Sequence, residues 1–214
     1  MILIAVTCSP YRYRVQLVRR LTDTERRAIF GVTTLNDKIF VIYEELPFIV
    51  VYISQQPYTR LPNISINGLK GPFDIAAGSS CLYVSDPGSL AIWRVKAADN
   101  KVDQWLSEVA AWSVSVTSEE KLVLLVWVGQ RVSDQERNLT HYCEIHVYSS
   151  DAVKETVIKL SRDITSPLCA VMTTRKTFIV SYGDEWHEMN RVCEMDMNGL
   201  MLKEIGRASC RERV

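Results

Sequence analysis

A strand, turn, strand pattern recurs along this chain, and its clearest copy is LYVSDPGSLAIWRV at residues 82–95. Two runs of apolar β-forming residues flank a turn cluster that contains Asp86, Pro87 and Gly88, and this is the signature of a β-hairpin. Related hairpins begin with IFVIY at residues 39–43, LVLLV at 122–126 and FIVSY at 178–182. The hairpin is therefore a repeat, and a repeat constrains the fold more than a single element does.

Each hairpin has a further strand-like segment on either side, which gives a repeating unit of four strands. The segments before it are FGVTT at 30–34, FDIAA at 73–77, WSVSV at 112–116 and CAVMT at 169–173. The segments after it are ISI at 64–66, VDQWL at 102–106, VIKL at 157–160 and MLKEI at 201–205. Four strands in roughly 40 to 50 residues are typical of a β-propeller blade. Continuous apolar runs such as LVLLVWV indicate strands covered on both faces, as stacked blades are.

We therefore expect an all-β protein, a β-propeller of four-stranded antiparallel blades. The predicted blades span residues 29–66, 72–106, 111–160 and 167–205, with a partial strand at 15–21 and a polar loop at 129–141. Residues 1–14 carry no defined prediction. Residues 205–214, IGRASCRERV, resemble the in-frame translation of a sequencing adapter, so residues 206–214 are expected to be an artefactual tail. About four blades and part of another predict a fragment of a larger ring.

Composition and charge argue against several classes of function. The chain holds 25 Lys and Arg against 25 Asp and Glu, without the positive excess that is typical of nucleic-acid-binding domains. No apolar run is long enough to predict a membrane span, and the apolar start lacks the basic residues of a signal peptide. The compartment stays open, with a slight preference for the cytoplasm. The six cysteines include no CxxC pair, so we expect no disulfide framework and mostly buried thiols.

The segments PFDIA, LYVSD and IWRV, at residues 72–76, 82–86 and 92–95, are similar to repeats of the NHL family and, more loosely, to those of YWTD-type propellers. The resemblance extends over residues 15–205 and is clearest in the second blade. It implies a six-bladed ring that serves as a rigid platform, whose loops bind protein and, in some NHL proteins, single-stranded RNA.

The chain departs from these families in two respects. Asp86, which ends the YWTD-like strand, is replaced in the other blades by Tyr43, Val126 and Tyr182. No RING, B-box or coiled-coil pattern precedes the repeats, so the resemblance does not imply a ubiquitin-ligase role.

No catalytic, cofactor-binding or metal site is predicted. His141, Cys143, Glu144 and His146 are residue types that bind metals, but in a strand Glu144 and His146 share one face while Cys143 points to the other. GDEWHE, with His187, is interpreted as a solvated hairpin tip, with calcium or a partner as the alternative ligand. The predicted innermost strands offer a single carboxylate among their polar candidates, which are Thr33, Asp74, Ser113, Ser115 and Cys169. One carboxylate alone makes neither a metal cage nor an acid/base pair.

The sequence thus predicts a non-catalytic interaction module, monomeric and without a cofactor, that binds a protein partner of unknown identity. The candidate contacts are the insertion at 129–141 and the loop aromatics Tyr58, Trp112, Tyr148 and Trp186. One alternative is a metal-dependent hydrolase or lyase of the six-bladed propeller type with ligands in missing blades. A second is single-stranded RNA binding, which the scattered cations Arg60, Lys70, Arg94, Lys96 and Arg131 disfavour.

Overall fold

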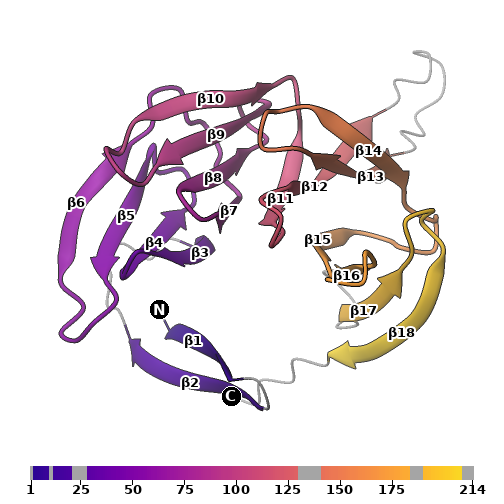
Figure 1. Cartoon of the computed structure of the whole chain (residues 1–214), viewed down its shortest axis with the longest axis horizontal. Helices are drawn as coiled ribbons and strands as arrows, with labels where there is room; N and C mark the ends of the chain where they lie inside the picture. The colour runs from indigo at the N-terminus through magenta and orange to yellow at the C-terminus, as the bar shows by residue number, and fades with distance from the viewer. Residues whose placement is uncertain (1, 10–11, 21–27, 130–140, 184–189, 209–214) are drawn as a thin grey trace.

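The computed structural model describes residues 2–9, 12–20, 28–129, 141–183 and 190–208. These residues form eighteen β-strands and no helix, so none of them belongs to a helix that could cross a membrane. Four sheets each contain four strands in consecutive antiparallel order, and a fifth sheet contains two. The predicted fold class is confirmed: the chain is a β-propeller whose blades surround a central axis (Figure 1).

The four blades repeat one strand order, with the first strand of each nearest the axis (Figure 1). Blade 1 contains β3 (Ile29–Leu35), β4 (Lys38–Tyr43), β5 (Phe48–Ile53) and β6 (Arg60–Ser65). Blade 2 contains β7 (Asp74–Ala77), β8 (Cys81–Asp86), β9 (Ala91–Lys96) and β10 (Val102–Ser107). Blade 3 contains β11 (Ala111–Val116), β12 (Leu122–Gly129), β13 (His141–Tyr148) and β14 (Lys154–Lys159). Blade 4 contains β15 (Pro167–Met172), β16 (Phe178–Tyr182), β17 (Asn190–Met195) and β18 (Met201–Ala208).

The two ends of the repeat array differ from the sequence expectation. Instead of one partial strand at residues 15–21, the structure has a hairpin of β1 (Ile2–Ser9) and β2 (Arg12–Arg20), which lies between blades 1 and 4 in the ring (Figure 1). At the other end, β18 continues past residue 205, and Gly206 to Ala208 pair with β17. Backbone pairing depends little on side-chain identity, so this pairing does not bear on the origin of the segment.

The outer strand of blade 1 also begins earlier than its ISI motif suggested. β6 starts at Arg60 and includes Pro62, and the register of its pairing with β5 shifts between Ile49 and Val51. Proline has no N–H for a sheet, but an outermost strand tolerates it because one side of the strand has no neighbour to bond. The prediction placed the strand by its apolar residues and therefore missed the polar half.

The hydrophobic core lies between the blades. Along β4, Phe40 and Ile42 belong to the apolar cluster shared with blade 2, whereas Ile39, Val41 and Tyr43 belong to a cluster on the opposite face. Further clusters lie between blades 2 and 3 and between blades 3 and 4. Because successive strand residues point to opposite faces, a strand covered on both sides needs apolar residues at every position. This explains the continuous apolar runs in the sequence.

Candidate functional site

Each innermost strand begins with a large apolar residue at a local irregularity. In blades 1, 3 and 4 the register shifts around Phe30, Trp112 and Leu168, which are left out of the pairing with the second strand. In blade 2, Phe73 stands just before β7, and its N–H donates to the Ser85 carbonyl at 2.9 Å. A β-bulge redirects a side chain and bends the strand. The bulge therefore recurs in blades 1, 3 and 4, and blade 2 has a large apolar residue at the same place without a register shift.

The aromatic members of this set pack in a row on the side of the disc where the inner strands begin. The ring centroids lie 5.1 Å apart for Phe30 and Phe73, and 4.6 Å apart for Phe73 and Trp112. Trp127, near the end of β12, extends the row at 5.5 Å from Trp112. Phe30 remains 38% exposed and Leu168 41% exposed. We call Phe30, Phe73, Trp112, Trp127 and Leu168 the collar, and the side of the disc on which the inner strands begin the collar face.

A buried carboxylate, Asp86, holds the segment that precedes the collar residue Phe73. Its oxygens accept hydrogen bonds from the backbone N–H groups of Lys70 at 2.9 Å and Gly71 at 2.8 Å, in the segment that leads to Phe73. The Ser89 hydroxyl donates at 2.5 Å, and the Trp93 indole N–H donates at 3.2 Å. Burial alone would raise the pKa of Asp86, but these donors outweigh it and lower the pKa. Asp86 is therefore an ionised hub that fixes the loop before the collar.

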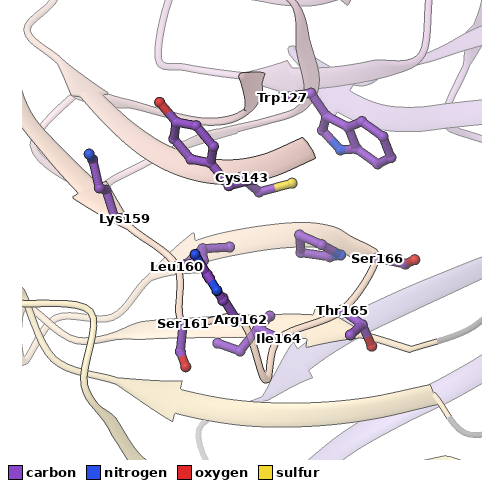
Figure 2. A pocket seen from close by; sticks show the side chains of 11 residues that line it. Trp127, Cys143, Lys159, Leu160, Ser161, Arg162, Ile164, Thr165 and Ser166 are labelled. Carbon is purple, nitrogen blue, oxygen red and sulfur yellow. The ribbon is translucent and has the colours of Figure 1, made fainter. Parts of the chain in front are cut away.

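A cavity of about 630 Å³ opens on the collar face between blades 3 and 4. One wall comes from β12 and β13 and includes Trp127 and Cys143. The opposite wall comes from the connection between β14 and β15, residues 160–166, and from Pro167 at the start of β15 (Figure 2). Leu160, Ile164 and Pro167 are buried, so the floor is apolar. Burial raises the pKa of the Cys143 thiol to about 11, which keeps it protonated and unreactive at neutral pH.

The two charged side chains among the described residues that line this cavity are both cations, Lys159 and Arg162. The Lys159 ammonium lies 5.5 Å from the centre of the Tyr142 ring, a cation–π geometry that holds it against the cavity wall. Trp127, Lys159 and Arg162 are not among the candidate residues predicted from the sequence. The repeated large apolar residue at the start of each inner strand could have located the collar, but no local motif marks the cavity.

The predicted polar residues of the inner strands mainly join neighbouring blades. The Asp74 carboxylate on β7 accepts a hydrogen bond from the Val114 N–H on β11 at 3.0 Å. The Ser115 hydroxyl on β11 donates to the Ala170 carbonyl on β15 at 2.8 Å. Burial raises the pKa of Asp74 and of Cys169. Ser113 is buried near both, and its hydroxyl makes no hydrogen bond of normal geometry in the structure. Thr33 lies on β3, half-buried.

The possible metal ligands on β13 separate as the strand alternation predicted. Cys143 belongs to the apolar cluster between blades 3 and 4. Glu144 and His146 are both buried, and His146 Nε2 lies 2.7 Å from a Glu144 carboxylate oxygen. The described residues contain no group of three or more His, Cys, Asp or Glu that could hold a metal. The side chain of His141 and the whole GDEWHE turn beyond Gly183, including His187, lie outside the described residues, as do residues 130–140.

The buried histidine predicts a pH dependence of stability. Burial, which is the largest effect, lowers the pKa of His146, and the nearby Lys154 acts in the same direction, while Glu144 opposes both. In the unfolded chain this imidazole takes up a proton as the pH falls below about 6.5. In the folded chain its lowered pKa delays protonation to a lower pH, so proton binding favours the unfolded state in between. The stabilisation is complete above about pH 6.5 and is lost as the pH falls toward the folded pKa. Urea titrations of the wild type and of His146→Gln between pH 5 and 8 should show a steeper loss in the wild type; equal slopes would contradict this.

Other sequence candidates divide between the core and the surface. Tyr148 is buried against Trp105 at a centroid distance of 6.1 Å, so it is a core residue. Tyr58 packs against the apolar cluster on the face of blade 1 that points away from blade 2. Trp186 lies outside the described residues. The cysteines at 81, 143, 169 and 193 are free thiols. Arg94 pairs with Asp103 at 2.8 Å, which leaves it no surplus charge for RNA.

The opposite side of the disc has a different chemistry. There the tight turns that follow the inner strands are joined by polar contacts: the Glu120 carboxylate accepts from the Ser79 N–H at 3.0 Å, and Glu119 pairs with Lys176. Lys121 pairs with Glu155 at 2.7 Å. These charged groups are engaged by neighbouring turns and strands, whereas the collar face presents apolar rings.

No protein-family model matches the chain, and no curated protein matches its sequence. Solved structures do match it. Hydrazine synthase of Kuenenia stuttgartiensis aligns at a TM-score of 0.59 and 12% identity over 85% of this chain and 49% of that one. A catalytically inactive virginiamycin B lyase from Staphylococcus aureus with quinupristin aligns at a TM-score of 0.56 and 10% sequence identity, over 83% of this chain and 55% of that one. A chain of a nidogen/laminin complex aligns at a TM-score of 0.53 and 10% sequence identity, over 83% of this chain and 80% of that one.

The chain spans about half the length of the first of these structures. At such low identity the likeness concerns the fold alone, and the proteins that share it include enzymes as well as a component of a complex between proteins. These alignments support the β-propeller fold that the repeats predicted for this chain.

Proposed function

We propose that this chain is a non-catalytic interaction module of NHL-like type that binds a protein partner through its collar face. The observation that carries the proposal is the collar itself, in which the inner strand of every blade has a large apolar residue at its start, on the same side of the disc. Apolar and aromatic residues gathered on one face mark interaction sites, because isolated exposed residues need no explanation but repeated ones do.

The contrast between the two faces supports this choice. On the opposite face, the carboxylates of Glu119 and Glu120 are engaged by the neighbouring turns. A partner that docked there would have to replace contacts that the fold already makes. On the collar face, Phe30 and Leu168 keep more than a third of their surface exposed, so covering them would remove apolar area from water.

The polar residues nearest the axis argue for binding over catalysis. Asp74 and Ser115 already bond to the next blade, and Asp74 is the one carboxylate among the five inner-strand candidates. A hydrolase or lyase of the propeller type would need further acidic or histidine ligands, and that alternative stays a prediction.

The collar can be tested by selecting peptides that bind the whole chain from a random library. We expect the recovered peptides to lose about tenfold or more in affinity for a Phe30→Ser/Leu168→Ser variant, because both side chains are exposed anchors. The matched control is Leu200→Ser/Leu202→Ser, which removes apolar residues that are 65% and 52% exposed on the outside of blade 4. Peptides that respond to the control and not to the collar variant would contradict the proposal.

A further inference from the structure

The cavity between blades 3 and 4 is contiguous with the collar but has its own charge. Trp127 belongs to both, since its ring packs against Trp112 in a tilted arrangement and also lines the cavity. Pro167, at the other wall, directly precedes the collar residue Leu168. A ligand that covers the collar would therefore also reach the cavity.

The cavity has a size and lining suited to a side chain with its neighbouring residues. Its volume of about 630 Å³ falls in the range of pockets that enclose small ligands. The apolar floor of Leu160 and Ile164, together with Trp127, suits an aromatic or aliphatic group (Figure 2). Hydroxyl groups of the exposed residues Thr165 and Ser166 supply donors at the rim.

The positive charge of the lining favours a negatively charged ligand. Both Lys159 and Arg162 are exposed, and no carboxylate among the described residues forms an ion pair with either of them. The acid closest to them in sequence, Asp163, accepts a hydrogen bond from the Ser161 hydroxyl at 3.3 Å and is not part of the lining. Glu144, which is opposite Lys159 in the sheet pairing, is engaged by His146. The described part of the lining is therefore cationic, with no counter-charge among the described residues.

We propose that this cavity binds an acidic peptide segment, with a carboxylate held by Lys159 and Arg162 and an adjacent aromatic or aliphatic side chain on the Trp127 side. The inference rests on the proposed function and names the chemistry of the partner. An acidic peptide fits better than a nucleic acid strand, because a strand needs a longer track of cations along its backbone and freely exposed ring faces. Here two cations flank one pocket, and Trp127 already packs near Trp112.

The test measures binding of a fluorescein-labelled peptide in which one phenylalanine lies between two pairs of glutamates, by fluorescence anisotropy with the whole chain. A second peptide replaces the glutamates with glutamines, and a third probe is a uridine-rich single-stranded RNA of similar length. We expect the acidic peptide to bind about tenfold tighter than the glutamine peptide, and its affinity to fall as salt rises, because charged contacts are screened.

The variant Lys159→Gln/Arg162→Gln should remove most of this preference, whereas Lys96→Gln/Lys101→Gln, which makes the same change in net charge at exposed positions of blade 2, should leave it. The inference would be overturned if the two peptides bound with equal affinity, or if the Lys159 and Arg162 variant kept the wild-type affinity. It would also be overturned if the RNA bound more tightly than the acidic peptide and depended on the same two residues. The Phe30→Ser/Leu168→Ser variant separates the two proposals. If library peptides still require the collar while the acidic peptide ignores the cavity cations, the binding face stands and the acidic ligand does not.

Discussion

Replacement of Asp86 by Ala is expected to lower the free energy of unfolding by about 3 kcal/mol, one of the two largest effects predicted for a single side chain of this protein. The carboxylate is fully buried and satisfies the backbone N–H groups of Lys70 and Gly71 as well as the Trp93 indole. Its loss leaves these partly buried donors without an acceptor, and each unmade bond of this kind costs about 1 kcal/mol or more.

Urea denaturation monitored by tryptophan fluorescence measures this change at pH 7. Asp103→Ala is the matched control, since Asp103 forms a partly exposed ion pair with Arg94 and such pairs contribute about 1 kcal/mol or less. Because the pKa of Asp86 is lowered in the fold, its contribution is present above the unfolded value of about 3.9 and is lost as the pH falls through the folded pKa. A loss no greater than that of Asp103→Ala would show that Asp86 does not fix the loop before the collar.

Phe178→Ala is expected to destabilise the chain by about 3 to 5 kcal/mol, the usual cost of removing a fully buried aromatic side chain. Phe178 is 0% exposed at the start of β16 and lies in the apolar cluster between blades 3 and 4, together with Ile145 and Ile158. The cavity left behind cannot collapse easily, because both of its walls are sheets held by their own ladders.

The effect should appear as a lower urea midpoint and a lower melting temperature. Leu200→Ala provides the comparison: it also removes a large apolar side chain, but one that is 65% exposed in the turn between β17 and β18, and it should change stability by about 0.5 kcal/mol or less. If Phe178→Ala were as mild as Leu200→Ala, the cluster between blades 3 and 4 would not be a rigid interface.

Several structural features could be predicted from the sequence because they depend on local patterns that recur. The strand, turn, strand unit is set by turn residues and by β-forming runs, and each of the four hairpins lies where the sequence placed it. The opposite orientations of Cys143 and His146 follow from strand alternation alone, and the structure confirms them. Asp86 was recognised as a motif residue, but its hydrogen bonds to a loop 15 and 16 residues away could not be read from spacing.

The sequence by itself therefore determined the strands, their grouping into fours and the apolar character of both faces of each blade, because these are properties of neighbouring residues in one segment. Only the tertiary structure showed that the large apolar residues at the starts of the four inner strands lie on one side of the disc, with Phe30, Phe73 and Trp112 packed in a row. Only it showed that Trp127 and Lys159 line a common cavity with the connection from β14 to β15. Those meetings depend on how one blade packs against the next, and the contacts that set this packing join residues far apart in the chain.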